Sequence, residues 1–301
     1  MKFGRIHTDL LAATDMHLPS DSAANMQVLG GTPAANPRIY LGCTQWKCDA
    51  WLDVIYPRGI RDTDILPTYI RHFNSIELNA MHYRIFPPET VARWAQHAAG
   101  TKFMFCPKFP QSISHHSGFK NTATFTHQFL ESITALGPHL GPAFLQVSDS
   151  YGPAQGEPLL AYLASLPNGM PFFVDLRQPE WFASERQQAT AQWLQQQGIG
   201  WVITDAPGRR DVCHMHLTTR TAFVRFLGNN MHPTDYPRID AWVQRISQWL
   251  QQGLENLYFF MHHPQEAGAP ELIDYMAEKL QAATGLVVKR PEFLARQGRL
   301  F

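Results

Sequence analysis

The chain has 301 residues, 45% of them hydrophobic, which is enough for one domain with a large core. Lysine plus arginine equal aspartate plus glutamate at 25 each, so the overall charge does not support strong non-specific nucleic-acid binding. No stretch is long and apolar enough to span a membrane, no secretory signal is recognisable, and the four cysteines form no C-x-x-C pair. These features predict a cytoplasmic protein with reduced thiols.

The first 37 residues differ in composition from the rest of the chain. Thr, Ser, Asp, Asn, Gly and Pro interrupt every short apolar stretch in residues 1–37. This pattern predicts an irregular N-terminal extension followed by one domain over residues 38–301. A lid over a binding site is the alternative interpretation, because long segments without regular structure sometimes have a function.

From residue 38 onwards, short apolar runs alternate with helix-like stretches. Near-continuous apolar runs are typical of parallel strands that are buried on both faces. Eight such runs, almost all followed by a predicted helix, predict an α/β fold of the (β/α)8 TIM-barrel class. An open doubly wound sheet is the alternative, but it normally has a glycine-rich phosphate loop after its first strand, which residues 42–47 lack. The eight runs are 38–42, 75–78, 102–106, 143–147, 171–177, 200–205, 222–227 and 256–262. The predicted helices lie near 63–72, 122–136, 158–165, 184–197, 239–252 and 270–283, and a further helix begins at the two prolines 87 and 88.

Several fragments of the sequence match, in the same order, fragments of a known family. They include Gly42-Cys43-Thr44-Gln45-Trp46, Ser75-Ile76-Glu77-Leu78-Asn79, Asp175-Leu176-Arg177-Gln178-Pro179-Glu180-Trp181-Phe182 and Phe223-Val224-Arg225-Phe226. On these residues the chain resembles the YecE-like family, also called domain of unknown function seventy-two, over about residues 38–283. The resemblance implies a barrel similar in fold to those of the endonuclease IV and xylose isomerase type, and it implies no particular reaction. The family's usual Gly-Thr-Ser-Gly-Trp opening is altered here, which is consistent with a divergent branch.

Polar side chains collect where the predicted strands end, and the active site of such a barrel lies at these carboxyl ends. Glu77 and Asn79 fall on one face of the second run, and Asp175 and Arg177 fall on one face of the fifth, because side chains alternate along a strand. We expect Glu77 or Asp175 to act as the catalytic acid or base. The candidate ligand-binding residues are Asn79, Tyr83, Arg84, Lys108, Arg177, Asp205, Arg225 and His262, together with the aromatic Trp46 and Trp181.

The expected ligand is a small anion, phosphorylated or sugar-like, held by Lys108, Arg84 and Arg225. Ordinary packing is the alternative for each aromatic residue. An internal network of ion pairs is the alternative for the charged residues, because buried charges need partners and structural networks resemble sites. The strand ends offer a single histidine position, at His262, so we predict neither a metal nor another cofactor.

Three kinds of function stay open. The first is binding of, or catalysis on, the small anion. The second is nucleic-acid binding by analogy with endonuclease IV-type barrels, for which Lys120, Arg209, Arg210 and Arg220 would form a basic rim. The third is a non-catalytic barrel that binds a metabolite or a partner. The sequence leaves enzymatic activity and oligomeric state undetermined.

Overall fold

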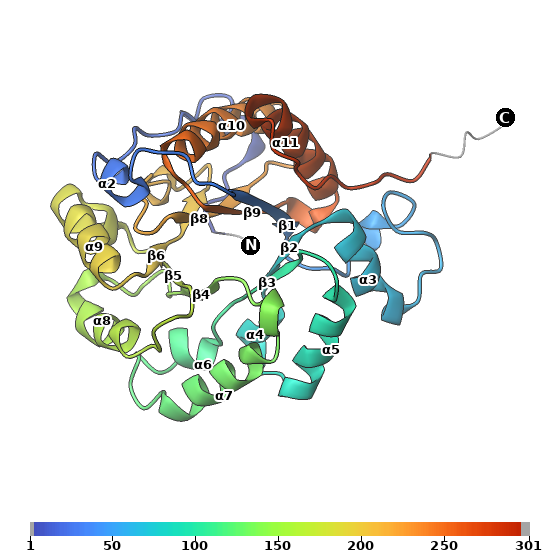
Figure 1. The fold of residues 1–301 in the computed structure, drawn as a ribbon. Helices are drawn as coiled ribbons and strands as arrows, with labels where there is room; N and C mark the ends of the chain where they lie inside the picture. Colours follow the sequence, from blue (N-terminus) through green and yellow to red (C-terminus); the bar gives the residue numbers. More distant parts are fainter. Residues whose placement is uncertain (1–2, 296–301) are drawn as a thin grey trace.

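The structure is a computed structural model that describes residues 3–295, and its fold is drawn in Figure 1. Each of the eight predicted apolar runs contains a strand, and the sixth contains two. The strands are β1 (Arg38–Cys43), β2 (Ser75–Leu78), β3 (Met104–Pro107), β4 (Ala143–Gln146), β5 (Phe172–Asp175), β6 (Gly200–Trp201), β7 (Ile203–Asp205), β8 (Thr221–Leu227) and β9 (Asn256–His262).

The strands form two parallel sheets, which gives an α/β fold. One sheet has the order β3-β2-β1-β9-β8-β7 and the other has the order β4-β5-β6. Backbone contacts also cross between the sheets. Lys108, just after β3, forms a parallel bridge with Phe144, and the Phe109 N–H donates to the Phe144 carbonyl over 2.9 Å. At the other edge, only Val202 separates β6 from β7, and its N–H donates to the Val174 carbonyl over 2.9 Å.

Helices lie around the outside of the strands in Figure 1. The helix predicted to start near residue 239 begins four residues earlier, at Asp235, because a proline in the first turn is compatible with a helix. It ends at Gln252 and is followed by the C-cap residue Gly253, which has a φ of 117°. The helices of the domain are α3 (Asp62–His72), α4 (Ala80–Tyr83), α5 (Pro88–Ala98), α6 (Gln111–Ser114), α7 (Ala123–Thr134), α8 (Gly156–Ala164), α9 (Ser184–Gln196), α10 (Asp235–Gln252) and α11 (Ala269–Thr284). Short 3-10 turns lie at Asp49–Trp51, Gly137–His139, Pro153–Gln155, Pro179–Phe182, Arg210–Val212 and Pro264–Glu266.

The N-terminal extension contains two short helices where the sequence predicted irregular structure. They are α1 (Thr8–Leu11) and α2 (Asn25–Leu29). The Asn25 side chain is buried, donates to the Met215 carbonyl and accepts from the Leu217 N–H, both over 2.9 Å. This part of the extension is therefore fixed to the segment before β8 by paired hydrogen bonds.

The hydrophobic core has a larger and a smaller part. The larger part includes residues of the helices and of the strands, whereas the smaller part consists almost entirely of strand residues. In the smaller part Tyr40 and Tyr258 stack with ring centroids 4.5 Å apart. Phe223 belongs to the same group, and Arg225 follows it by two residues on β8, so both side chains lie on one face of that strand. The smaller part of the core consists of Tyr40, Cys106, Phe144, Phe173, Val202, Phe223, Tyr258 and Phe260.

Within residues 3–295, the helices are all too short or too polar to cross a membrane. The four cysteines are buried and unbridged.

Candidate functional site: a buried charged cluster at the strand ends

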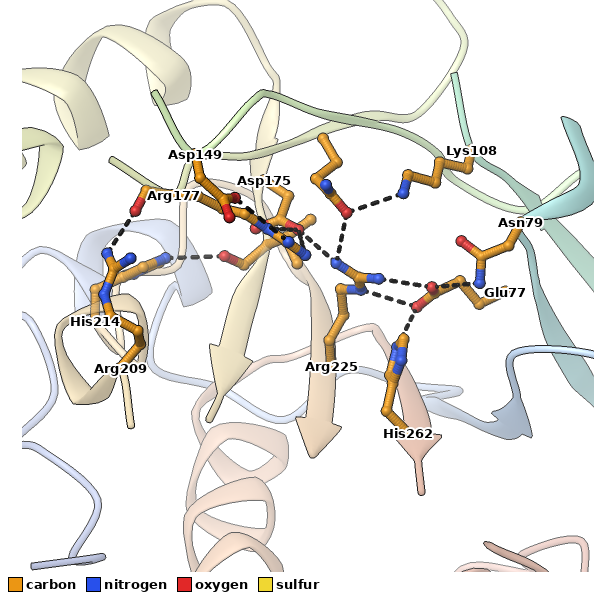
Figure 2. Close-up of polar contacts among 12 residues, drawn as sticks. Glu77, Asn79, Lys108, Asp149, Asp175, Arg177, Arg209, His214, Arg225 and His262 are labelled. Atoms are coloured by element: carbon orange, nitrogen blue, oxygen red, sulfur yellow. Dashed lines mark hydrogen bonds and ion pairs between the residues drawn. The ribbon is translucent and has the colours of Figure 1, made fainter. Parts of the chain in front are cut away.

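Arg225 of β8 lies at the centre of a group of charged and polar side chains (Figure 2). They come from β2, β4, β5, β8 and β9 and from the residues just after β2, β3 and β5. The Arg225 guanidinium holds Glu77 through two bonds, from Nε to Oε2 over 3.0 Å and from Nη2 to Oε1 over 2.8 Å. Its Nη1 donates to Asp175 Oδ2 over 2.6 Å. We call this group the Arg225 cluster, and it consists of Glu77, Asn79, Lys108, Gln146, Asp175, Arg177, Arg225 and His262.

Glu77 of β2 uses both of its oxygens in this cluster. Besides Arg225, Asn79 Nδ2 donates to Oε1 over 2.9 Å, and His262 Nε2 lies 2.9 Å from Oε2. Burial by itself raises the pKa of Glu77, but Arg225 and His262 outweigh it and hold that pKa well below its usual value. Burial lowers the pKa of His262 to about 4, although the neighbouring Glu77 carboxylate acts in the opposite direction. Glu77 is therefore an ionised, fully partnered carboxylate, a geometry that suits an ion pair better than a proton carrier.

Asp175, the last residue of β5, differs from Glu77 because one of its oxygens is free to accept. Oδ2 accepts from Arg225 and from Arg177 Nη2, the latter over 3.2 Å. Oδ1 is buried and has no hydrogen-bond partner in the described part of the chain. Arg177 Nη1 also lies 3.6 Å from the carboxylate of Asp149, a side chain that is 60% exposed. This arrangement places one open acceptor inside the cluster and one solvent-facing carboxylate at its edge.

Lys108 enters the cluster from the end of β3. Its Nζ donates to Gln146 Oε1 over 2.9 Å, and the same oxygen accepts from Arg225 Nη1 over 3.2 Å. Within residues 3–295, no carboxylate oxygen lies within 4.0 Å of Lys108 Nζ. Burial and the neighbouring Arg225 lower the pKa of Lys108 to about 7. Lys108 is thus a buried amine whose hydrogen-bond acceptor is a neutral amide.

Asp205, a predicted ligand-binding residue at the end of β7, belongs to a different group of ion pairs. Its carboxylate accepts from Arg238 over 3.0 Å and from Trp242 Nε1 over 2.8 Å, and it also pairs with Arg210. Arg238 comes from α10 and in turn pairs with Asp235 over 3.2 Å. This second group links α10 to the end of β7 and supplies Asp205 with partners of its own.

Four further predicted residues have surroundings outside the Arg225 cluster. Tyr83 is 74% exposed, and the exposed Arg84 places its guanidinium 4.3 Å from the ring centre of Phe86. Trp46 packs edge-on against Trp94 of α5, with ring centroids 5.3 Å apart. Trp181 is buried and donates from Nε1 to the Tyr151 carbonyl over 2.8 Å. The contacts of the two tryptophans are those of packing residues, and the role of all four in binding a ligand stays a prediction.

The N-terminal extension reaches the edge of the Arg225 cluster. The Phe3 ring lies over two guanidinium groups, 4.2 Å from that of Arg177 and 5.0 Å from that of Arg209. The Gly208 N–H donates to the Gly4 carbonyl over 2.7 Å and holds the segment in place. Phe3 therefore covers one side of Arg177, a position consistent with the lid interpretation.

Two residues of this region were not among the predicted catalytic or ligand-binding residues, although the sequence placed one of them, Gln146, at the end of the fourth run. Gln146 ends β4 and joins Lys108 to Arg225, and its place at a strand end was the signal for it. Glu266 follows β9, where Oε1 accepts from the Thr44 hydroxyl over 3.0 Å and Oε2 is buried without a partner among the described residues. Burial raises the pKa of Glu266 to about 7. Its position in an irregular loop gave no periodic signal.

Two further kinds of site bear on function: a metal site and the basic rim expected of a nucleic-acid-binding protein. Across residues 3–295, no group of three or more His, Cys, Asp or Glu residues is arranged to hold a metal ion. The arginines considered for a basic rim are paired with carboxylates: Arg209 with Asp211, Arg210 with Asp205, and Arg220 with Glu255.

The fold and the cluster define a parallel α/β protein with a buried ion-pair network at the carboxyl ends of its strands. A family model described as "Protein of unknown function DUF72" matches residues 40–296. The chain is 31% identical over 262 residues to the UPF0759 protein YecE of Escherichia coli, in strain K12 and in O157:H7, and this match covers 81% of the chain and 93% of each relative. The chain belongs to the DUF72 family, which confirms the resemblance seen in its sequence.

Solved structures show the same relationship at the level of the fold. A crystal structure of a DUF72 family protein from Enterococcus faecalis V583 matches with a TM-score of 0.63 and 18% identity over 85% of this chain and 100% of that one. Another, from Thermotoga maritima MSB8, matches with a TM-score of 0.62 and 19% identity over 83% of this chain and 100% of that one.

Proposed function

We propose that the strands form a closed (β/α)8 barrel and that the Arg225 cluster at its carboxyl end binds a small anionic ligand, phosphorylated or sugar-like. The observation that carries this proposal is Lys108, a buried amine without a carboxylate partner in residues 3–295. Buried charges in proteins are normally paired, so an incoming anion would supply the counter-ion that the protonated form of Lys108 lacks.

Closure of the barrel is supported by the contacts at the two seams between the sheets. The bridge between Lys108 and Phe144 joins β3 to β4, and Val202 continues β6 into β7. Eight parallel strand segments joined in this way would leave no free edge. Closed barrels have their ligand sites at the carboxyl ends of the strands, where the Arg225 cluster lies.

Arg177 is the second cation of the proposed site. The mostly exposed Asp149 lies 3.6 Å from its guanidinium, which indicates that a carboxylate can approach Arg177 from the solvent side. A carboxylate or phosphate on a ligand would compete with Asp149 for this position. If the protein is an enzyme, Asp175 is a better candidate for the catalytic base than Glu77, because only Asp175 has an unpartnered oxygen.

The test is to titrate the protein with inorganic phosphate, ribose 5-phosphate and glucose 6-phosphate. Calorimetry measures the dissociation constants, and thermal unfolding measures the change in melting temperature. A bound ligand raises the melting temperature. Lys108→Ala should weaken binding about 10- to 100-fold, because a hydrogen bond to a charged group contributes about 1.5–3 kcal/mol. Lys102→Ala, which removes an exposed lysine two residues before β3, should leave binding unchanged. Equal dissociation constants for Lys108→Ala and the unaltered protein would contradict the proposal.

Asp149→Asn should change phosphate affinity in the opposite direction from Lys108→Ala. The substitution removes the negative charge beside Arg177 while keeping the shape of the side chain, so phosphate should bind several-fold more tightly. Calorimetry on the two proteins at low ionic strength measures this, and weaker binding by Asp149→Asn would speak against an anion at Arg177.

Nucleic-acid binding and binding of a partner protein gain no specific support from the described residues. Three of the four cations of the expected basic rim, Arg209, Arg210 and Arg220, are paired with carboxylates, and the fourth is the exposed Lys120. A cytoplasmic location stays a prediction.

A further inference from the structure

We propose that Lys108 is an amine nucleophile that forms a Schiff base with a carbonyl group of the small anionic ligand. This inference rests on the proposed function, because it uses the same site, and it adds the substrate class: a 2-oxo acid, or the open-chain aldehyde or ketone form of a sugar phosphate.

The surroundings of Lys108 favour the neutral amine over the ammonium ion. Nζ is buried and shares its acceptor, Gln146 Oε1, with a guanidinium nitrogen of Arg225. Two cations that share one neutral oxygen repel each other, and a neutral amide cannot compensate a charge as a carboxylate does. Lysine nucleophiles are activated in this way, by burial and by a neighbouring cation. The charged and titratable groups that interact electrostatically with Lys108, and so bear on its pKa, are Arg225, Glu77, Arg177, Asp175, His82 and His115.

The fraction of neutral amine at neutral pH follows from the pKa. Burial and Arg225 lower the pKa of Lys108 to about 7, so about half of the side chain is neutral there. An exposed lysine with a pKa near 10.4 is neutral in only about four molecules in ten thousand. Lys108 therefore presents a neutral amine far more often than a lysine on the surface does.

A second group of the cluster is placed to handle protons. Arg225 Nη1 donates both to Gln146 Oε1, the acceptor of Lys108, and to Asp175 Oδ2, so one guanidinium nitrogen and one amide oxygen connect Lys108 to Asp175. The other oxygen of Asp175 is buried and unpartnered in the described part of the chain. Because no carboxylate oxygen lies within 4.0 Å of Lys108 Nζ in residues 3–295, this oxygen would take a proton from the attacking amine and return one to the departing oxygen through one bridging water.

The reaction balances without a further reagent. The Nζ lone pair forms a C–N bond to the carbonyl carbon, and the C=O π electrons move to the oxygen, which takes up the proton that nitrogen releases. The C–O bond of this carbinolamine then breaks as the nitrogen lone pair forms C=N. The oxygen leaves as water after receiving one more proton from the solvent, so the product is a protonated imine. The anionic part of the ligand, held at Arg177, compensates the positive charge of a protonated imine.

Reductive trapping tests the inference. The full-length protein is incubated with pyruvate, dihydroxyacetone phosphate or ribose 5-phosphate in the presence of sodium cyanoborohydride, and adducts are located by intact mass and peptide mapping. We expect one adduct per chain, on Lys108, formed at least about tenfold faster than on exposed Lys102, because Lys108 has the larger neutral fraction. Inorganic phosphate should slow trapping by competing for the site.

Two variants provide the controls. Lys108→Arg keeps a positive charge and should give no adduct at position 108, and Lys102→Arg should keep the adduct on Lys108 unchanged. Circular dichroism of both variants establishes that they fold. Adducts spread evenly over surface lysines, or no adduct at all while phosphate still raises the melting temperature, would overturn the Schiff base and leave anion binding intact. If phosphate also failed to bind, the proposed function itself would be wrong.

Discussion

Arg225 is the cation that compensates the buried carboxylates of the cluster. Its guanidinium compensates Glu77 and Asp175 together, and all three side chains are at most 2% exposed. Its flat face also lies 5.3 Å from the ring centre of Phe144, so the cluster is next to the aromatic interior between the strands. A buried ion pair contributes little net stability when it is complete, but its loss on one side leaves an uncompensated charge.

Arg225→Met should therefore destabilise the protein strongly. It leaves two buried carboxylates without their main counter-ion, and the free energy of unfolding should fall by about 3–5 kcal/mol. Urea unfolding measures this quantity. Arg93→Met, which removes an exposed arginine of α5, serves as the matched control and should change stability by less than about 0.5 kcal/mol. A loss below about 1 kcal/mol for Arg225→Met would show that the cluster is not a coupled ion-pair network.

Lys108 gives the protein a pH-dependent stability with a definite sign. Its pKa falls to about 7 in the folded protein, whereas an unfolded lysine titrates near about 10.4. Between these values the unfolded chain binds a proton that the folded protein lacks, so the free energy of unfolding rises with pH, by at most about 1.4 kcal/mol per unit. Below that window both states are protonated and the cost of burying the charge is fully present.

Lys108→Met should consequently stabilise the protein more at about pH 6 than at about pH 9.5. Denaturant unfolding of the two proteins at both pH values isolates this group, because every other titration is shared. Lys102→Met should show no such difference between the two pH values, since that lysine is exposed. If Lys108→Met changed the free energy of unfolding equally at both pH values, the pKa of Lys108 would not be lowered in the folded protein.

At the scale of elements, the close approach of β1 and β2 depends on a glycine. A Cβ at Gly42 would lie 2.0 Å from the Ser75 carbonyl oxygen, a backbone atom that cannot move without separating the strands. The register of Gly42 with Ser75 places Glu77 of β2 at the cluster. The same glycine lies in the motif Gly42-Cys43-Thr44-Gln45-Trp46 that carries the family resemblance.

Gly42→Ala should thus destabilise the protein by about 1–3 kcal/mol, the usual cost of overpacking. Gly152→Ala is the control, because its Cβ would meet the flexible end of Gln178 at 3.2 Å. Thermal unfolding compares the two variants. If Gly42→Ala were as stable as Gly152→Ala, β1 and β2 would not be as close as the structure shows.

At the scale of the whole molecule, the proposed closed barrel depends on the backbone hydrogen bonds that join the two sheets. The seams depend on a few amides: Phe109 donates to Phe144, Gly141 donates to Phe105, and Val202 donates to Val174. In a closed barrel these bonds belong to a continuous ring, whereas between separate sheets they would open easily.

Hydrogen exchange monitored by NMR tests this closure. The amides of Phe109, Gly141 and Val202 should be protected to nearly the same degree as central amides of β8 and β9, because opening a closed ring requires large-scale unfolding. The amide of exposed Asp149 is the internal reference for fast exchange. Exchange of the three seam amides at the rate of Asp149 would favour two separate sheets.

The strands and helices were largely predictable from the sequence, and single residues show where that prediction was incomplete. The apolar runs located every strand, but the break at Val202 and the start of α10 at Asp235 depend on local backbone pairing that apolar patterning does not encode. Alternation along β2 and β5 placed Glu77 and Asp175 at strand ends, and the structure brings both to Arg225. Asp205 also lies at a strand end, as the sequence predicted, but it pairs with Arg238 of α10 and not with Arg225. Which cation lies nearest to a carboxylate depends on the packing of the helix on the strands, which the strand pattern does not encode.

The sequence by itself determined the order of strands and helices, the family, and which ionisable side chains lie near strand ends, since these follow from periodicity and from ordered motifs. The tertiary structure alone decided which charges neutralise one another. Equal numbers of acidic and basic residues do not show which residues pair. The Coulomb energy of a pair depends on the distance between its two charges, and the charges here come from strands that lie far apart in the sequence. Only in three dimensions does Lys108 meet an amide and a guanidinium in place of a carboxylate, and its expected reactivity follows from that arrangement.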